Sequence, residues 1–90
     1  MAIVAIIVKI MPDSPSTDLE AIKKIAKTTL EAEGAMNISF EEKPIAFGLK
    51  AIFIKMAWKE EKDTSIIEDK LAKIPHVSSA VISDYRRAFG

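Results

Sequence analysis

Hydrophobic and polar positions follow one another along the chain in a pattern that predicts six secondary-structure elements. Ala2 to Ile10 is an almost uninterrupted run of Ile, Val and Ala, which is typical of a buried central strand. Apolar residues then recur every three or four positions, which predicts a helix with one buried stripe. The stripe consists of Leu19, Ile22, Ile25, Ala26 and Leu30. Thr17 to Glu20 has the form of a capping box at the start of this helix, and Gly34 is suited to end it.

Two strands are predicted next, on either side of a short loop. Asn37 to Glu42 alternates between polar and apolar residues, with Ile38 and Phe40 facing inward, and indicates an edge strand. Leu49 to Trp58 is strongly apolar and predicts a second buried strand.

The last part of the chain predicts a helix and a final strand. Ser65 to Glu68 offers a second capping box, and Pro75 stops the helix that follows. The inward positions of this helix are Ile67, Leu71 and Ile74. Val77 to Tyr85 is the last predicted strand, and Arg86 to Gly90 is expected to form a short tail.

The order of the elements predicts an α+β fold of the ferredoxin-like βαββαβ plan. Right-handed crossovers then place both helices on one face of a four-stranded antiparallel sheet. The two most apolar strands, the first and the third, are expected to be central.

The first strand has two apolar faces, although the helices can cover only one of them. Val4, Ile6, Val8 and Ile10 share one face, and Ile3, Ala5, Ile7 and Lys9 share the other. An uncovered apolar face predicts a partner or self-association. Alternatively, the long stems of Lys9 and Lys55 cover it.

Composition narrows the functional class. Ninety residues predict a single domain, 1–90. The 13 basic and 13 acidic residues give a formal net charge of zero, whereas a general nucleic-acid binder usually carries an excess of basic residues. The absence of cysteine excludes disulfides and thiolate metal sites. No segment reaches the length of a transmembrane helix, and Ala2 to Val8 lacks the flanks of a signal peptide. We therefore expect a cytoplasmic protein with no membrane partner.

No constellation for covalent chemistry is evident. His76 is the only histidine and is interpreted as a solvated loop residue. The adjacent pairs Glu41–Glu42 and Glu60–Glu61 are expected to be solvated, since neighbours in a strand point to opposite sides. There is no glycine-rich phosphate loop. The sequence predicts no enzyme, no cofactor and no metal site.

The loop between the second and third strands stands out. Pro44 removes a backbone donor and ends the second strand, and Gly48 permits backbone angles that other residues avoid. Between them, Phe47 either enters the core as a plug or meets a partner. Ala46 to Lys50 is superficially similar to an RNA-recognition motif, but the aromatic pair expected on its third strand is missing.

Four segments together resemble elongation factor 1-beta of the archaeal type. They are Val8 to Pro12, the Ser14-Pro15 and Thr17 to Glu20 that follow it, Pro44 to Ala51, and Asp84 to Phe89. The resemblance implies a ferredoxin-like module that releases GDP from the GTPase elongation factor 1-alpha by non-covalent binding. Eukaryotic relatives carry this module behind an N-terminal interaction region that has no counterpart here, so we expect a minimal exchange module.

The resemblance also implies a set of residues that contact the GTPase. Phe47 matches the aromatic of the family's loop, and Pro44 and Gly48 match residues that shape it. Eukaryotic members carry a next-to-last lysine that reaches toward the partner's magnesium site, whereas Phe89 stands at that place here. The nearest basic residues are Arg86 and Arg87, which either act on the partner or form a solvated pair.

A second interpretation of the function remains open beside nucleotide exchange. A ferredoxin-like regulatory or small-ligand-binding domain that self-associates through the open sheet would share the same pattern. An RNA-binding module is a third.

Overall fold

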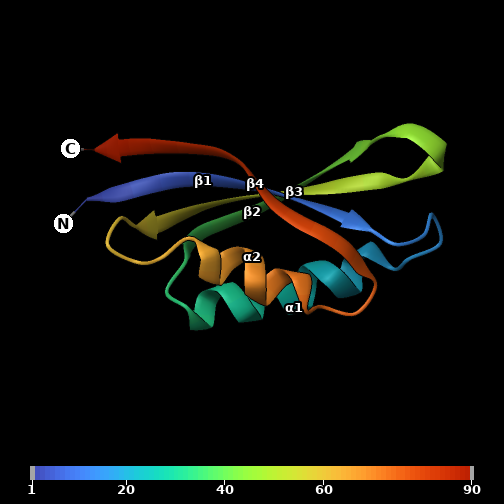
Figure 1. Cartoon of the computed structure of the whole chain (residues 1–90), viewed down its shortest axis with the longest axis horizontal. Coiled ribbons are helices and arrows are strands. Elements are labelled where there is room, and N and C mark those ends of the chain that lie inside the picture. The colour runs from blue at the N-terminus through green and yellow to red at the C-terminus, as the bar shows by residue number, and fades with distance from the viewer. Residues whose placement is uncertain (1, 90) are drawn as a thin grey trace.

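A computed structural model describes residues 2–89, with only the backbone of residues 88 and 89. The elements are β1 (Ile3–Pro12), α1 (Leu19–Ala32), β2 (Met36–Pro44), the short 3-10 turn η1 (Ala46–Gly48), β3 (Lys50–Lys59), α2 (Ser65–Ala72) and β4 (Val77–Phe89). The strands form one antiparallel sheet in the order β2-β3-β1-β4. Both helices lie on one side of it (Figure 1), which confirms the ferredoxin-like α+β prediction.

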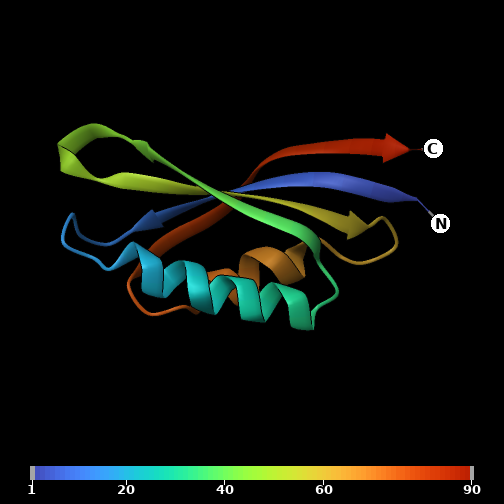
Figure 2. The ribbon, with the colours of Figure 1, turned by 180° about the vertical axis from the view of Figure 1, so that it is seen from behind.

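The core lies between the sheet and the helix layer, with β1 and β3 central as predicted. Val4, paired with Trp58, and Val8, paired with Ile54, are fully buried on the inner face. Figure 2 shows α1 beneath the β2 side of the sheet, and α2 packs nearer β4. The opposite face of the sheet has no covering layer within residues 2–89. No helix in this part of the chain is long and apolar enough to cross a membrane.

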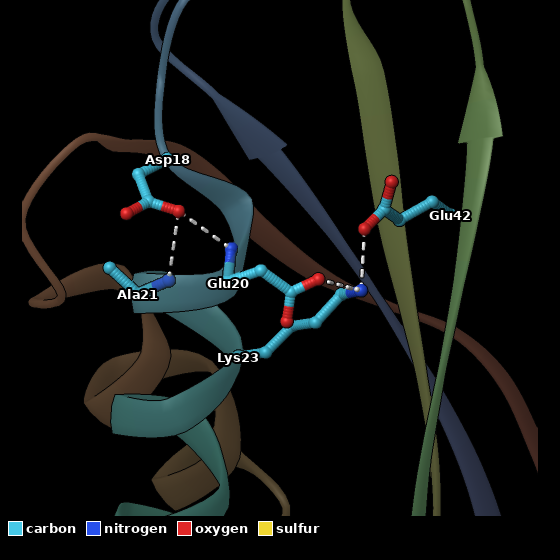
Figure 3. A network of polar contacts seen from close by, with 5 residues as sticks. All are labelled: Asp18, Glu20, Ala21, Lys23 and Glu42. Atoms are coloured by element: carbon cyan, nitrogen blue, oxygen red, sulfur yellow. Dashed lines mark hydrogen bonds and ion pairs between the residues drawn. The ribbon is translucent and has the colours of Figure 1, made fainter.

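The N-cap of the first helix lies one residue later than predicted. Asp18, not Thr17, is the N-cap, because its Oδ1 accepts hydrogen bonds from the backbone N–H groups of Glu20 (3.1 Å) and Ala21 (3.3 Å). Figure 3 shows this cap. The Thr17 hydroxyl instead donates to Asp13 Oδ1 at 2.9 Å. The capping box predicted with Thr17 is therefore wrong.

Two other predictions for the helices are wrong. The Glu68 carboxylate, predicted to cap α2, accepts a hydrogen bond from the backbone N–H of Ile82 in β4 at 3.0 Å. Asp63 Oδ1 accepts from the backbone N–H of Ser65 at the start of α2. Ile25 is 42% exposed, because α1 buries only the row Ile22, Ala26 and Leu30, and Ile25 lies to one side of it.

Residues 86–89 of the predicted C-terminal tail are part of β4, and Gly90 lies outside the described residues. Arg87 pairs with Val4, and the backbone of Phe89 pairs with Ile3, so the strand continues well past Tyr85. Pairing with a central strand satisfies backbone groups that a free tail would leave to water. The tail prediction is therefore wrong.

A β-bulge at Ser83 changes which way the end of β4 faces. Ile82 pairs with Val8 but Asp84 pairs with Ile7, so Ser83 is the extra residue. Its hydroxyl donates to the carbonyl oxygen of Ile7 at 3.2 Å. Beyond the bulge, Asp84 and Arg86 face the uncovered side of the sheet.

Candidate functional site

The β2–β3 loop holds Phe47 out in solvent. Pro44 is the last residue of β2, and the loop is closed by a hydrogen bond from the Ile45 N–H to the Leu49 carbonyl oxygen at 2.8 Å. Phe47 has φ 64° and ψ 28°, and Gly48 has φ 74°, so both lie in the left-handed region. A left-handed conformation costs about 1–2 kcal/mol for a residue with a Cβ. The Phe47 side chain is 91% exposed, so the core-plug interpretation is wrong.

Two further loops lie near the same end of the molecule. A Cβ added to Gly48 would lie 4.0 Å from Pro15 Cβ, so the β1–α1 loop passes beside the turn. That loop is joined to the α2–β4 connection, where the His76 carbonyl accepts from the Asp13 N–H at 2.9 Å. His76 Nδ1 also lies 3.4 Å from Asp13 Oδ2. His76 is exposed, as predicted, but it has a partner that its sequence position did not reveal.

An ion pair holds the strand that leads into the Phe47 loop. Lys23 Nζ of α1 lies 2.5 Å from Glu42 Oε2 of β2 and 3.3 Å from Glu20 Oε1 (Figure 3). The hydrogen bond from Lys23 lowers the pKa of the Glu42 carboxyl, and the same bond raises the pKa of Lys23. Glu42 was predicted to be solvated, whereas it ties β2 to the helix layer two residues before Pro44.

Arg87 is engaged in a second ion pair that the sequence did not reveal. Its Nε donates to Glu60 Oε2 at 2.7 Å and its Nη2 to Glu60 Oε1 at 2.6 Å, which is a bidentate contact. These hydrogen bonds lower the pKa of the Glu60 carboxyl and raise the pKa of Arg87. Glu60, also predicted to be solvated, therefore anchors the end of β4.

Arg86 points to the uncovered face of the sheet instead. Its Nε lies 3.0 Å from Asp84 Oδ2, and its side chain is 78% exposed. An ion pair this exposed is weak and opens easily. The side chain of Phe89, the other candidate in this region, lies outside the described residues.

The candidate residues fall into two groups at opposite ends of the molecule. Pro44, Phe47 and Gly48 lie at one end, and Arg86 and Arg87 lie toward the other, where the chain termini are (Figures 1 and 2). The longest dimension is 41 Å, against 22 and 19 Å for the others. One partner that contacts both groups must therefore extend along most of the domain.

The polar side chains form no centre for covalent chemistry within the described part of the chain. Glu41 and Glu42 point to opposite faces, since Glu41 pairs with Phe53 and Glu42 with Ile52. Among residues 2–89, no group of three or more His, Asp or Glu side chains is arranged to hold a metal ion.

Comparison with known proteins gives one consistent result. Residues 5–87 match the family model described as "EF-1 guanine nucleotide exchange domain". The chain is 40% identical to an elongation factor 1-beta of Methanosphaera stadtmanae over 88 residues, which cover 97% of this chain and 98% of that protein. It is 41% identical to that of Methanobrevibacter smithii, covering 88% and 89%, and 38% identical to that of Methanocella arvoryzae, covering 99% and 100%.

Proposed function

The chain belongs to the EF-1 guanine nucleotide exchange domain family, and on that premise we propose that residues 1–90 form one domain that releases GDP from elongation factor 1-alpha. It acts as a non-catalytic exchange factor of translation, in the cytoplasm. The nucleotide-free GTPase binds this domain more tightly than the GDP-bound form does. By thermodynamic reciprocity, the domain then weakens GDP binding by the same factor.

The exposed, left-handed Phe47 is the observation that carries this proposal. A strained backbone that presents a large aromatic to water is destabilising for the free domain and is typical of a functional contact. Aromatic side chains that enter a pocket on a partner often contribute most of the binding energy. Pro44 and Gly48 support the same role because they set the shape of the turn.

At the other end, Arg86 is the better candidate for the nucleotide side of the GTPase. Its exposed pair with Asp84 is weak, so the guanidinium is free to meet an anion such as a phosphate group. Arg87 holds Glu60 in a bidentate pair and is better suited to position the end of β4. A contact by Phe89 stays a prediction.

Release of a fluorescent GDP analogue tests the proposal. Purified elongation factor 1-alpha from the same source is loaded with the analogue and mixed with excess unlabelled GTP, with and without this protein. We expect substoichiometric amounts to accelerate release, since each molecule acts repeatedly. No acceleration of a GTPase that a known exchange factor does activate would refute the proposal.

A matched pair of variants separates the two ends. Phe47→Ala is expected to raise the concentration of factor needed for half-maximal release. Arg86→Ala is expected to lower the maximal rate more than it changes that concentration, because its role lies at the nucleotide. Equal behaviour of the two variants would contradict these separate roles.

A further inference from the structure

The turn that carries Phe47 is closed by hydrogen bonds of its own. The Ile45 N–H donates to the Leu49 carbonyl oxygen at 2.8 Å, and the Leu49 N–H donates to the Ala46 carbonyl oxygen at 3.3 Å. Both bonds lie within the turn, so neither ties it to the rest of the domain. The Phe47 side chain is 91% exposed and adds little to its hold. Such a turn moves on the nanosecond to microsecond timescale unless another segment supports it.

The loop between β1 and α1, residues 13–18, lies beside this turn at the same end of the molecule (Figure 1). A Cβ added to Gly48 would lie 4.0 Å from Pro15 Cβ, which is an ordinary van der Waals distance. The two segments therefore run side by side, with no side chain of Gly48 between them. This closeness limits how far the turn can move toward the β1–α1 loop.

Pro15 occupies a corner that the β1–α1 loop holds in place. The Thr17 N–H donates to the Ser14 carbonyl oxygen at 3.2 Å, which closes a four-residue turn with Pro15 at its second position. The Ser14 hydroxyl also accepts a hydrogen bond from the Ser16 N–H at 3.2 Å. Serine at the first position and proline at the second suit such a turn, because the proline ring presets φ. Pro15 therefore has little freedom to yield when the Phe47 turn moves.

Asp13 ties the β1–α1 loop to two other elements. Its N–H donates to the carbonyl oxygen of His76 in the α2–β4 connection at 2.9 Å. Its Oδ1 accepts from the Thr17 hydroxyl at 2.9 Å, next to the N-cap of α1, and its Oδ2 lies 3.4 Å from His76 Nδ1. One residue thus holds the loop from both sides.

We propose that the β1–α1 loop is a brace for the Phe47 turn, with Pro15 as its point of contact and Asp13 as a positioning residue. This inference rests on the proposed exchange function. The brace limits the orientations of Phe47 before the GTPase arrives, so less conformational freedom is lost on binding. Asp13 acts through Phe47 and does not itself touch the GTPase.

GDP release by single and double variants tests the brace. Asp13→Ala is expected to raise the half-saturating concentration of factor about fivefold, which is about 1 kcal/mol, and to leave the maximal rate unchanged. In a Phe47→Ala background the same change should alter that concentration by less than about twofold, because the aromatic that the loop positions is gone. The matched control Asp69→Ala removes an exposed carboxylate on α2 and is expected to leave both quantities unchanged.

Selective labelling of glycine with ¹⁵N supplies a readout that does not depend on the GTPase. The chain has three glycines, and Gly34 serves as the internal reference. Backbone relaxation should give the Gly48 amide an order parameter of about 0.8 in the parent and below about 0.6 in Asp13→Ala, with Gly34 unchanged. Pro15→Gly keeps the Asp13 carboxylate, guards against misfolding and is expected to loosen Gly48 in the same way.

Two results would overturn the brace and leave the exchange function standing. One is an equal effect of Asp13→Ala with and without Phe47, which would show that the loop acts on exchange independently of the turn. The other is a Gly48 amide that is as mobile in the parent as in both loop variants. If the unmodified protein fails to accelerate GDP release, the exchange function falls, and the Gly48 order parameters still decide whether the loop restrains the turn.

Discussion

Replacing Phe47 by alanine should separate folding from exchange. A phenylalanine side chain buries about 200 Å² when it is fully enclosed. Phe47 is 91% exposed, so the free domain buries less than a tenth of that area. At about 25 cal/mol per Å² this burial contributes only about 0.5 kcal/mol to folding. We therefore expect Phe47→Ala to change the free energy of unfolding by no more than that amount.

The expected effect on the partner is much larger. Truncating an aromatic anchor at the centre of an interface typically costs about 2 kcal/mol or more, which is roughly a 30-fold increase in the half-saturating concentration. Phe47→Gly should lose exchange to the same extent. Its stability should also stay close to that of the parent, because the left-handed strain that glycine relieves offsets its greater freedom in the unfolded chain.

Phe40 supplies the control for this prediction. It lies in β2 and packs against the core, so Phe40→Ala should lower the free energy of unfolding by about 2 kcal/mol. Its exchange activity per folded molecule should persist. Denaturant unfolding measures the stability of all three variants, and GDP release measures their activity. A loss above about 1.5 kcal/mol in Phe47→Ala, or full exchange activity in that variant, would refute the reasoning.

Three further predictions concern the framework of the domain. Asp18→Ala should lower the unfolding free energy by about 1 kcal/mol and Thr17→Ala by clearly less; equal losses in denaturant unfolding would contradict the cap at Asp18. Gly48→Ala should cost about 1 kcal/mol through its φ of 74° rather than through a clash, and unchanged stability would exclude the left-handed turn. Hydrogen bonds from Arg87 lower the pKa of Glu60 from its ordinary value of 4.5. The ion pair therefore stabilises the fold at pH values above 4.5. This stabilisation is lost as the pH falls through the lowered pKa of Glu60 in the folded protein. The stability difference between the parent and Glu60→Gln, measured by unfolding at several pH values, should therefore close in acid; a constant difference would contradict the pair.

The sequence predicted the fold because its main signals are local. The apolar run in β1 and the helical repeat in α1 each identify an element and its inner face without knowledge of the other elements. The uncovered apolar face followed from counting the layers. The errors lie where a local motif has more than one possible partner. The sequence positions of Thr17 and Glu68 both suit a helix cap. In the structure the Thr17 hydroxyl donates to Asp13 instead, and the Glu68 carboxylate accepts from the backbone of β4.

The candidate site was predicted less completely. The resemblance singled out Phe47, Arg86 and Arg87, yet composition alone did not decide whether Phe47 enters the core. The ion pair of Arg87 with Glu60 joins residues 27 positions apart. Neither residue carries a signal of that pairing in its own neighbourhood.

The sequence by itself determined the order of the elements, the inner face of the sheet and the absence of cysteine chemistry, because each depends on residue type and local spacing. Tertiary structure decided which way the end of β4 faces. The bulge at Ser83 lies against β1, where the Ser83 hydroxyl donates to the carbonyl oxygen of Ile7, 76 positions away. The bulge shifts the alternation of side chains by one residue. Asp84 and Arg86 thereby reach the uncovered face and Arg87 reaches Glu60. The antiparallel sheet then places the Phe47 turn and the end of β4 that carries Arg86 at opposite ends of the molecule, a relation that no local pattern contains.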